Sequence, residues 1–354
     1  MKRKYNDDVK QDRLSDLPDS VVLHILSFFN TKEAAQTCIL SKRWKNLWKF
    51  VTTLKLSTRH FETIHPFTKF VSHVLSHRDD STALQALDSH RASIVEAYLL
   101  KKIVKYAVSH SVQQLQISVD ADFQCFPPCF FSCNTLTSLK LSLGFNTLFP
   151  NFLNLPALTS LSLRSFVFHN SDDGRVEPFS KFKMLNSLII DSCMVCDAQN
   201  LCISSPKLVS LTILQSYFGI ELSVPSLHTF TFTGCTIPNK IYGSKSNLST
   251  IKHVNIDLPS VWESAKTSSA LLSWLSEFAG IESLTVSLDA LKVLSLVPEL
   301  SKVELPSLHN LKLLKVGRFG RSSIPGRIVD FLLQNSPSAK VNVITYSGHN
   351  FLWG

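Results

Sequence analysis

One short apolar phrase recurs through the last two thirds of the chain and limits its fold more than any other feature. In each copy a second apolar residue follows the first by three positions, and a third follows by two more. Neighbouring copies begin between 19 residues (208 to 227) and 30 residues (251 to 281) apart. Such a period is typical of a stack of repeats. The copies begin at Val112, Leu136, Leu158, Leu185, Leu208, Leu227, Ile251, Ile281 and Leu311.

The phrase resembles the consensus of leucine-rich repeats. The resemblance implies an α/β fold, a curved solenoid in which each repeat adds a strand to a parallel sheet on the concave face. Residues between the leucines should point out of that face, because side chains alternate along a strand. An ordinary solvated sheet uses the same short hydroxyl side chains, so a purely structural role stays open for each of them. The candidate target-binding residues are Ser138, Lys140, Ser160, Ser162, Arg164, Asp191, Thr212 and Thr231.

Residues 12–49 carry a different pattern, three short amphipathic segments. Leu17, Val21 and Ile25 recur at helical spacing, and Thr31 and Ser41 are expected to cap a second and a third helix. Fewer than forty residues cannot bury this much apolar surface among themselves. Part of it therefore packs on the following domain or faces a partner, and the residues alone leave both alternatives open.

Three separated elements of this segment match the F-box pattern: Leu17-Pro18, Ile25-Leu26-Ser27 and the run 40–44, LSKRW. The chain resembles the plant F-box/leucine-rich-repeat family, whose three-helix F-box docks on a Skp-family adaptor and through it on a cullin scaffold. Phe29-Asn30 departs from the family, which often carries Leu-Pro there, and alters a loop. The adaptor contacts that the resemblance implies are Leu14, Leu17, Pro18, Val21, Ile25, Leu26, Leu40, Ser41, Trp44 and Trp48.

These patterns divide the chain into six segments. We expect a flexible basic tail at 1–11, the F-box at 12–50, and an opening strand with a helical cap at 51–110. Leucine-rich repeats follow at 111–304. Residues 305–346 resemble the FBD region that closes many plant members of the family, and 347–354 form a tail.

Most of the net positive charge of the chain lies in its N-terminal part. Residues 1–110 hold 18 Lys and Arg against 11 Asp and Glu, and residues 111–354 hold 18 against 16. Nucleic-acid-binding proteins gather basic side chains on the binding surface, and the repeats are close to neutral. Nucleic acid is therefore not an expected partner. The charged start of the chain does not resemble a secretory signal, and neither a membrane-spanning nor a membrane-bound form is expected.

The sequence gives little indication of catalytic activity or metal binding. It lacks the nucleotide-binding, hydrolase and metalloprotease motifs that mark common active sites. Cys193 and Cys196 have CxxC spacing, but no second pair completes a zinc site. Cys193 and Cys235 instead follow the apolar phrase where leucine-rich repeats use Asn or Cys, so a buried structural role is expected. We expect no cofactor, no metal and no catalytic residue.

Together these observations predict a non-catalytic substrate-recognition subunit of an SCF-type ubiquitin ligase, located in the cytoplasm, the nucleus or both. The F-box would bind the adaptor, and the repeats would bind a target protein whose identity the residues do not reveal. The alternative is a leucine-rich-repeat scaffold that binds a protein partner without ubiquitylation. No residue separates these two interpretations.

Overall fold

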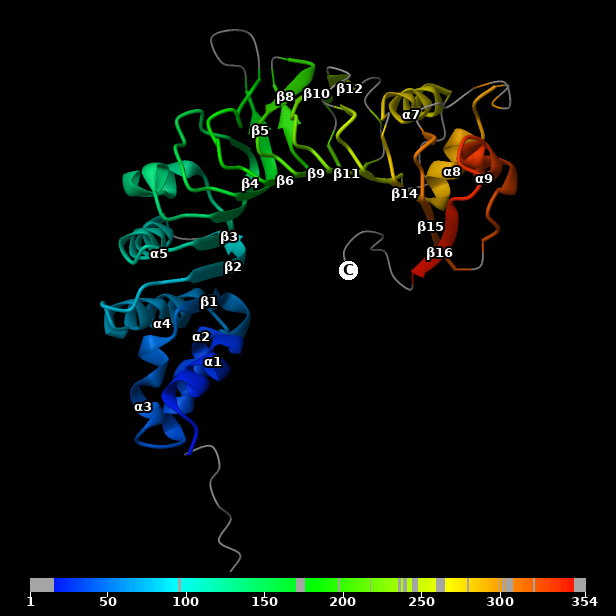
Figure 1. Cartoon of the computed structure of the whole chain (residues 1–354). Helices are drawn as coiled ribbons and strands as arrows, with labels where there is room; N and C mark the ends of the chain where they lie inside the picture. The colour runs from blue at the N-terminus through cyan, green and yellow to red at the C-terminus, as the bar shows by residue number, and fades with distance from the viewer. Residues whose placement is uncertain are drawn as a thin grey trace, which may run out of the picture.

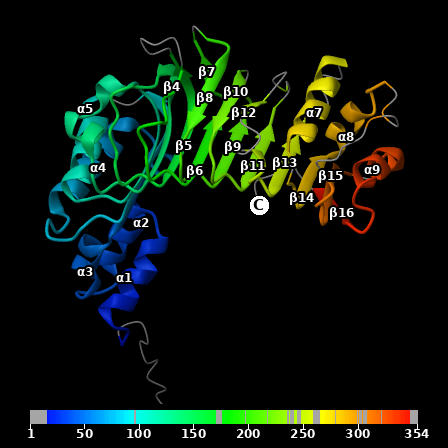
Figure 2. The ribbon, with the colours of Figure 1, turned by 45° about the horizontal axis from the view of Figure 1, so that its top comes forward.

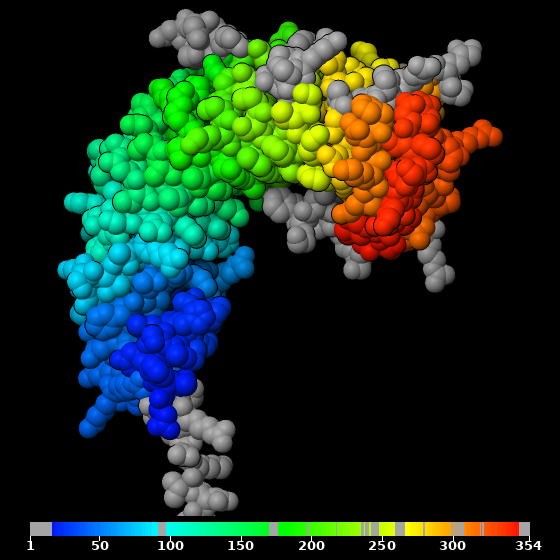
Figure 3. All heavy atoms as spheres, viewed as in Figure 1, coloured from blue at the N-terminus to red at the C-terminus, as the bar shows by residue number. Residues whose placement is uncertain are grey.

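The computed structural model describes residues 16–94, 97–169, 176–196, 198–216, 218–234, 237, 241–243, 248–258, 265–278, 280–298, 300, 303, 308–320 and 322–346. The backbone forms a curved arch, with a helical module at the N-terminal end and the last strands at the other (Figure 1). The space-filling view shows the hollow beneath the arch (Figure 3).

One long parallel sheet lines the inner side of the arch. Its strands follow the order β1-β2-β3-β4-β5-β6-β9-β11-β13-β14-β15-β16, and β7 pairs with β5 beside this path. The strands are β1 (Thr53–Ser57), β2 (Ala86–Ile94), β3 (Gln114–Asp120), β4 (Ser138–Leu148), β5 (Ser160–Phe168), β6 (Ser187–Asp191), β7 (Met194–Val195), β9 (Ser210–Leu214), β11 (Thr229–Thr233), β13 (His253–Asp257), β14 (Ser283–Ser287), β15 (Leu313–Phe319) and β16 (Lys340–Tyr346).

The recurring phrases occupy equivalent places in this sheet. The second apolar residue of each phrase pairs with its counterpart in the next repeat, from Leu115 and Leu139 through to Leu284 and Leu314. The nine side chains in this row are at most 2% exposed. The sequence period is therefore the spacing of one continuous apolar core, which confirms the predicted solenoid with a parallel sheet.

Helices and a smaller sheet cover the outer side of the arch (Figures 1 and 2). The helices are α4 (Ile64–His77), α5 (Ala97–Ser109), α7 (Ala265–Glu277), α8 (Leu288–Leu294) and α9 (Gly326–Leu333), with short 3-10 turns η3 (Thr58–His60), η4 (Phe123–Cys125) and η5 (Pro128–Ser132). The second sheet has the order β12-β10-β8, formed by β8 (Asn200–Ser204), β10 (Gly219–Ser223) and β12 (Ile241–Gly243).

Residues 51–110 differ from the expected opening strand and helical cap. The opening strand is present as β1, but a further strand, β2, pairs with β1 on one side and β3 on the other. Helices α4 and α5 thus belong to the first two repeats and lie on the outer side of the sheet. The apolar phrase does not reveal β2 because Ser89 stands where Leu56 and Ile117 stand in the neighbouring strands.

The N-terminal module contains α1 (Asp19–Phe28), α2 (Thr31–Gln36), η1 (Thr37–Ile39), α3 (Trp44–Leu47) and η2 (Trp48–Phe50). The expected cap of the second helix is wrong by one residue. Asn30 Oδ1 accepts the Glu33 backbone N–H at 2.9 Å, and Glu33 Oε2 accepts the Asn30 N–H at 3.2 Å. This reciprocal pair is a capping box, which asparagine forms as well as threonine does.

Thr31 instead closes the edge of the long sheet. Its Oγ1 accepts the backbone N–H of Lys55 in β1 at 2.8 Å, and Thr31 is only 5% exposed. An edge strand leaves such groups without a ladder partner. The Lys55 ammonium in turn donates to the carbonyl oxygens of Ser27 and Phe28 at the end of α1, at 3.1 and 3.3 Å. The N-terminal module therefore caps the stack itself, the role expected of residues 51–110.

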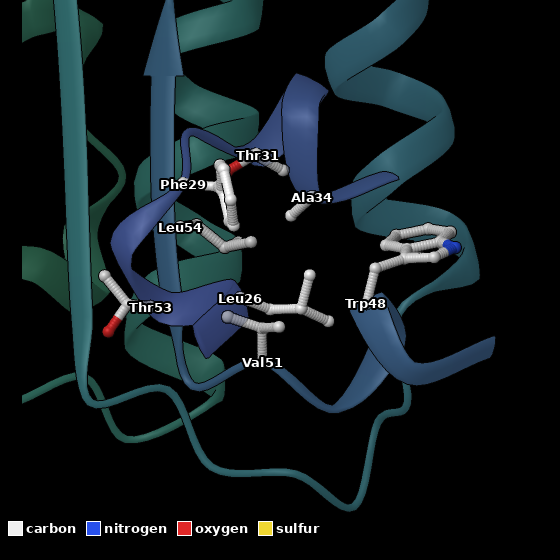
Figure 4. Close-up of a pocket in the computed structure, with 8 residues that line it drawn as sticks. All are labelled: Leu26, Phe29, Thr31, Ala34, Trp48, Val51, Thr53 and Leu54. Carbon is white, nitrogen blue, oxygen red and sulfur yellow. The ribbon is translucent and has the colours of Figure 1, made fainter. Parts of the chain in front are cut away.

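The module and the first strand share one apolar interior. Leu26 and Ala34 from the module converge with Trp48 and with Leu54 from β1 (Figure 4). The crevice between these side chains has no room for a water molecule. This packing joins the module to the repeats and leaves no ligand site between them at this point.

Thr31→Val tests the contribution of the edge cap. Valine keeps the size of threonine but leaves the half-buried Lys55 N–H without its acceptor, so the free energy of unfolding should fall by about 1–3 kcal/mol. Urea unfolding of the whole chain measures this. The matched control is Thr137→Val, since the Thr137 hydroxyl bonds the Gln113 carbonyl at an exposed site, and its cost should stay below about 0.5 kcal/mol. Equal costs for both variants would contradict the capping role.

The opposite end of the sheet is less well covered. Within the described part of the chain, β16 pairs with β15 alone. Val341 and Val343 stand in register with Leu314 and Val316, yet they are 42% and 47% exposed, whereas Leu314 and Val316 are fully buried. The rows of core side chains thus reach the surface at this edge.

Candidate adaptor-binding and target-binding surfaces

A single arginine joins the two ends of the N-terminal module. Arg43 Nε donates to Asp19 Oδ1 at 2.9 Å, and the Arg43 guanidinium also donates to the carbonyl oxygen of Leu17. The Leu17-Pro18 turn that begins α1 is therefore held beside the turn that precedes α3. The two sequence elements furthest apart in the expected F-box motif are neighbours in the structure.

The expected adaptor contacts differ in their solvent exposure. Pro18, Val21 and Leu40 are exposed, Val21 at 40% and Leu40 at 63%. Leu17, Ile25 and Ser41 are half-buried. Leu14 lies outside the described residues.

The other three expected contacts lie inside the module. Leu26 is fully buried, and Trp44 and Trp48 are 5% and 8% exposed. In this conformation they have almost no surface to offer a partner. Their apolar spacing reflects packing against the chain's own core, the alternative that the residues had left open.

Four further apolar side chains of the module are exposed and were not expected to be. Ile39 is 84% exposed, Phe28 70%, Phe29 43% and Phe50 40%. Phe28 lies on the helical stripe of Val21 and Ile25, and Ile39 precedes Leu40, so their spacing could have revealed them. Exposed apolar groups gathered in a short module mark an interaction surface.

Comparison with known proteins decides what this module is. The F-box domain model matches residues 14–55. Among relatives from Arabidopsis thaliana, one F-box/LRR-repeat protein is 28% identical over 370 residues, covering 94% of this chain and 78% of the relative. A second is 28% identical over 349 residues, covering 93% and 72%. An F-box/FBD/LRR-repeat protein is 25% identical over 364 residues, covering 94% and 77%.

The chain is therefore similar to plant F-box/leucine-rich-repeat proteins over nearly its whole length. The module of α1, α2 and α3 is its F-box, and the arch is its repeat domain. The expected target contacts lie on strands β4, β5, β6, β9 and β11 of the long sheet.

Those contacts form neighbouring rows on the concave face. Ser138 pairs with Ser160, and Lys140 pairs with Ser162. Arg164 pairs with Asp191 across β5 and β6, and their side chains form an ion pair with an Nε to Oδ2 distance of 3.1 Å. The rows thus bring most of the expected residues onto one surface, where Lys140 and Arg164 are exposed.

Thr212 and Thr231 continue the same face toward the centre of the arch. Thr212 is half-buried, and Thr231 is 8% exposed because its Oγ1 accepts a hydrogen bond from the Asn255 amide at 3.0 Å. Thr231 therefore supports the sheet surface more than it offers a contact. Target binding by any of these residues stays a prediction.

Strand β13 ends in Asp257, a carboxyl group with a raised pKa. Burial is the main cause, a hydrogen bond with Ser287 opposes it and nearby Asp289 adds to it, so that together they raise the pKa of Asp257 to about 6. Because the pKa of Asp257 is higher in the folded state, protonation of Asp257 stabilises the fold. This stabilisation is complete below the ordinary aspartate pKa near 4. It is lost as the pH rises through about 6.

Asp257→Asn tests this linkage. The neutral amide has no charge to bury, so at pH 7 the variant should exceed the wild type in free energy of unfolding by about 1–2 kcal/mol, a figure reduced for partial solvent screening. At pH 4 the two proteins should differ little. Urea unfolding at both pH values measures the difference, and an identical difference at pH 4 and pH 7 would contradict it.

Cys193 has the buried position expected for it after the repeat phrase. The side chain is fully buried, and its thiol lies 3.4 Å from the Asp191 carbonyl oxygen. Burial raises the pKa of the Cys193 thiol to about 12, so it stays protonated at neutral pH. Cys196, three residues on, is exposed, and Cys235 lies outside the described residues.

A thiol titration distinguishes these cysteines. In the native protein, 5,5′-dithiobis(2-nitrobenzoate) should react quickly with the exposed Cys129 and Cys196, whereas Cys193 should react only after unfolding. The number of thiols that react only after unfolding should be one lower in Cys193→Ala than in the wild type. Rapid reaction of the Cys193 thiol in the native protein would show that its site opens to solvent.

The described residues contain no group of three or more His, Cys, Asp or Glu side chains arranged to hold a metal ion. Within the same residues, no helix has both the length and the apolar character needed to cross a bilayer.

Proposed function

We propose that this protein is a substrate-recognition subunit of an SCF-type ubiquitin ligase, with the F-box docking on a Skp-family adaptor. The exposed apolar surface of the F-box carries this proposal. Pro18, Val21 and Leu40 belong to the family motif or its helical stripe, and Phe28 and Ile39 extend the same apolar character. The repeat domain leaves these side chains uncovered, although it covers Leu26, Trp44 and Trp48.

The contacts between F-box and repeats support a second part of the proposal, a fixed orientation of the target. Thr31, Lys55 and the shared interior make the F-box the first layer of the solenoid. Docking the F-box on an adaptor would therefore set the direction in which the arch points. A rigid connection raises the effective concentration of target lysines near the recruited E2 enzyme.

The chemistry of ubiquitin transfer then belongs to the recruited E2 enzyme, whose catalytic cysteine forms the thioester. This chain contributes binding and positioning. We place the target on the concave face, with Lys140 and Arg164 as the exposed charged contacts among short hydroxyl side chains. A protein that meets this surface needs hydrogen-bonding groups more than a large apolar patch.

Reconstituted ubiquitin transfer tests the function. The whole chain is mixed with purified adaptor, cullin and RING subunits, E1, E2, ubiquitin and ATP, and modification of the chain or of an added target is followed by gel shift. Transfer that depends on both the chain and the cullin supports the ligase. A chain that binds the adaptor but promotes no transfer would favour the scaffold alternative, in which the repeats bind a partner without ubiquitylation.

A further inference from the structure

An aromatic pocket lies where strands β4 and β5 end, and none of its lining residues belongs to the F-box or to the expected target contacts. Its volume is about 560 Å³, within the range of sites that hold small molecules. Phenylalanines supply five of the ten lining residues, from η4 and the residue after it, from η5 and from the turn after β4, and His169 follows β5. The connections after three successive strands, β3, β4 and β5, therefore build the pocket together.

The floor of the pocket is rigid. Phe126 is 4% exposed and Phe149 is 1% exposed. The Phe149 ring meets those of Phe166 and Phe168 edge to face, with centroids 5.9 and 5.7 Å apart and interplanar angles of 90° and 66°. A floor held by such contacts cannot fill the space by changing rotamer, so the pocket is formed before any ligand arrives.

The rim of the pocket exposes apolar surface to solvent. Phe152 is 66% exposed and Leu148 is 58% exposed, and the Phe152 ring lies 4.9 Å from that of Phe131. Covering these side chains would remove apolar area from water, which favours binding. A ligand seated on the floor would reach the rim as well.

The polar groups of the lining decide the class of ligand. Among the described residues that line the pocket there is no lysine, arginine, aspartate or glutamate, and His169 is the one ionisable side chain of that set. A charged ligand group would therefore lose its hydration without gaining an opposite charge. The side-chain amides of Gln124 and Asn151 also line the pocket and make no hydrogen bond within the described residues. Each can donate and accept.

We propose that this pocket binds a neutral, mainly aromatic small molecule that carries one or two hydrogen-bonding groups. Aromatic rings of the ligand stack on the phenylalanine floor, and its polar group meets the amide of Gln124 or Asn151. The site is independent of adaptor docking, because none of its residues belongs to the F-box.

The probe for this site is N-phenyl-1-naphthylamine, a neutral aromatic amine whose fluorescence rises in apolar surroundings. The whole chain should bind it saturably, with a Kd on the order of 10–100 µM for a ligand of this size. Phe152→Asp and Leu148→Asp place a charge on the rim and should each weaken binding at least tenfold. Both side chains are largely exposed, so circular dichroism should show unchanged folding.

Phe145→Asp is the matched control. Phe145 is 92% exposed and close in sequence, but it does not line the pocket, so its replacement should leave the Kd unchanged. Three results would overturn the proposal: no saturable binding by the folded wild type, unchanged binding by both rim variants, or equal weakening by Phe145→Asp. Adaptor binding by the same samples should be normal throughout, which separates this test from that of the ligase function.

Discussion

Leu40→Asp is expected to abolish binding of the chain to a Skp-family adaptor while leaving the fold intact. Leu40 is 63% exposed in the free protein, so an aspartate there is solvated and costs little stability. In the complex the same carboxylate would be buried without a partner. A penalty of about 3 kcal/mol or more lowers the affinity more than a hundredfold. Isothermal titration calorimetry with purified adaptor measures the change.

The controls for this variant separate docking from folding. Phe145→Asp introduces the same charge at an exposed phenylalanine of the repeats and should bind the adaptor normally. The double variant Leu17→Ala with Pro18→Ala removes apolar surface without adding charge, and it should also lose binding. Wild-type affinity in Leu40→Asp would show that the adaptor uses another surface.

Arg78→Leu is expected to lower the stability of the whole chain by about 3 kcal/mol or more. Arg78 is 3% exposed, and its guanidinium donates to the carbonyl oxygens of Val51, Thr82 and Ala83 at 2.9–3.2 Å and to the Tyr106 hydroxyl at 3.2 Å. Leucine would leave the buried Val51 carbonyl and the half-buried acceptors of Thr82, Ala83 and Tyr106 without this donor, at about 1–3 kcal/mol for a buried group and less for the others. Arg78 thus ties the end of the F-box to the first two repeats.

Urea unfolding of Arg78→Leu and Arg59→Leu makes the comparison direct. Arg59 is exposed, and its guanidinium lies 3.3 Å from His90 Nε2. Its replacement should cost less than about 0.5 kcal/mol. Similar losses in the two variants would mean that the buried hydrogen bonds of Arg78 contribute little to stability.

The repeats could be predicted because the core imposes its spacing on the sequence. Each strand must present apolar residues at the same places as its neighbours, so the phrase around Leu139 or Leu284 repeats. Strand β2 breaks this pattern at Ser89, and only its pairing with β1 and β3 reveals it. The small sheet of β8, β10 and β12 was not predicted, although its paired residues Leu201, Ile220 and Ile241 are 19 and 21 residues apart.

The F-box surface could be predicted as a set of residues, but its exposed and buried members could not be separated. Val21 and Leu26 are both apolar residues of one short helix, yet one is 40% exposed and the other fully buried. Their difference depends on where β1 and η2 lie, which is tertiary information. The aromatic pocket was missed for a similar reason, because Phe123, Phe152 and His169 line one pocket only after three repeats have stacked.

Sedimentation of the purified chain mixed with a purified Skp-family adaptor tests the central proposal most directly. The proposed docking predicts one species with the mass of a 1:1 complex at micromolar concentrations, and predicts its absence with Leu40→Asp. A folded wild-type chain that sediments alone beside free adaptor would contradict the proposed function.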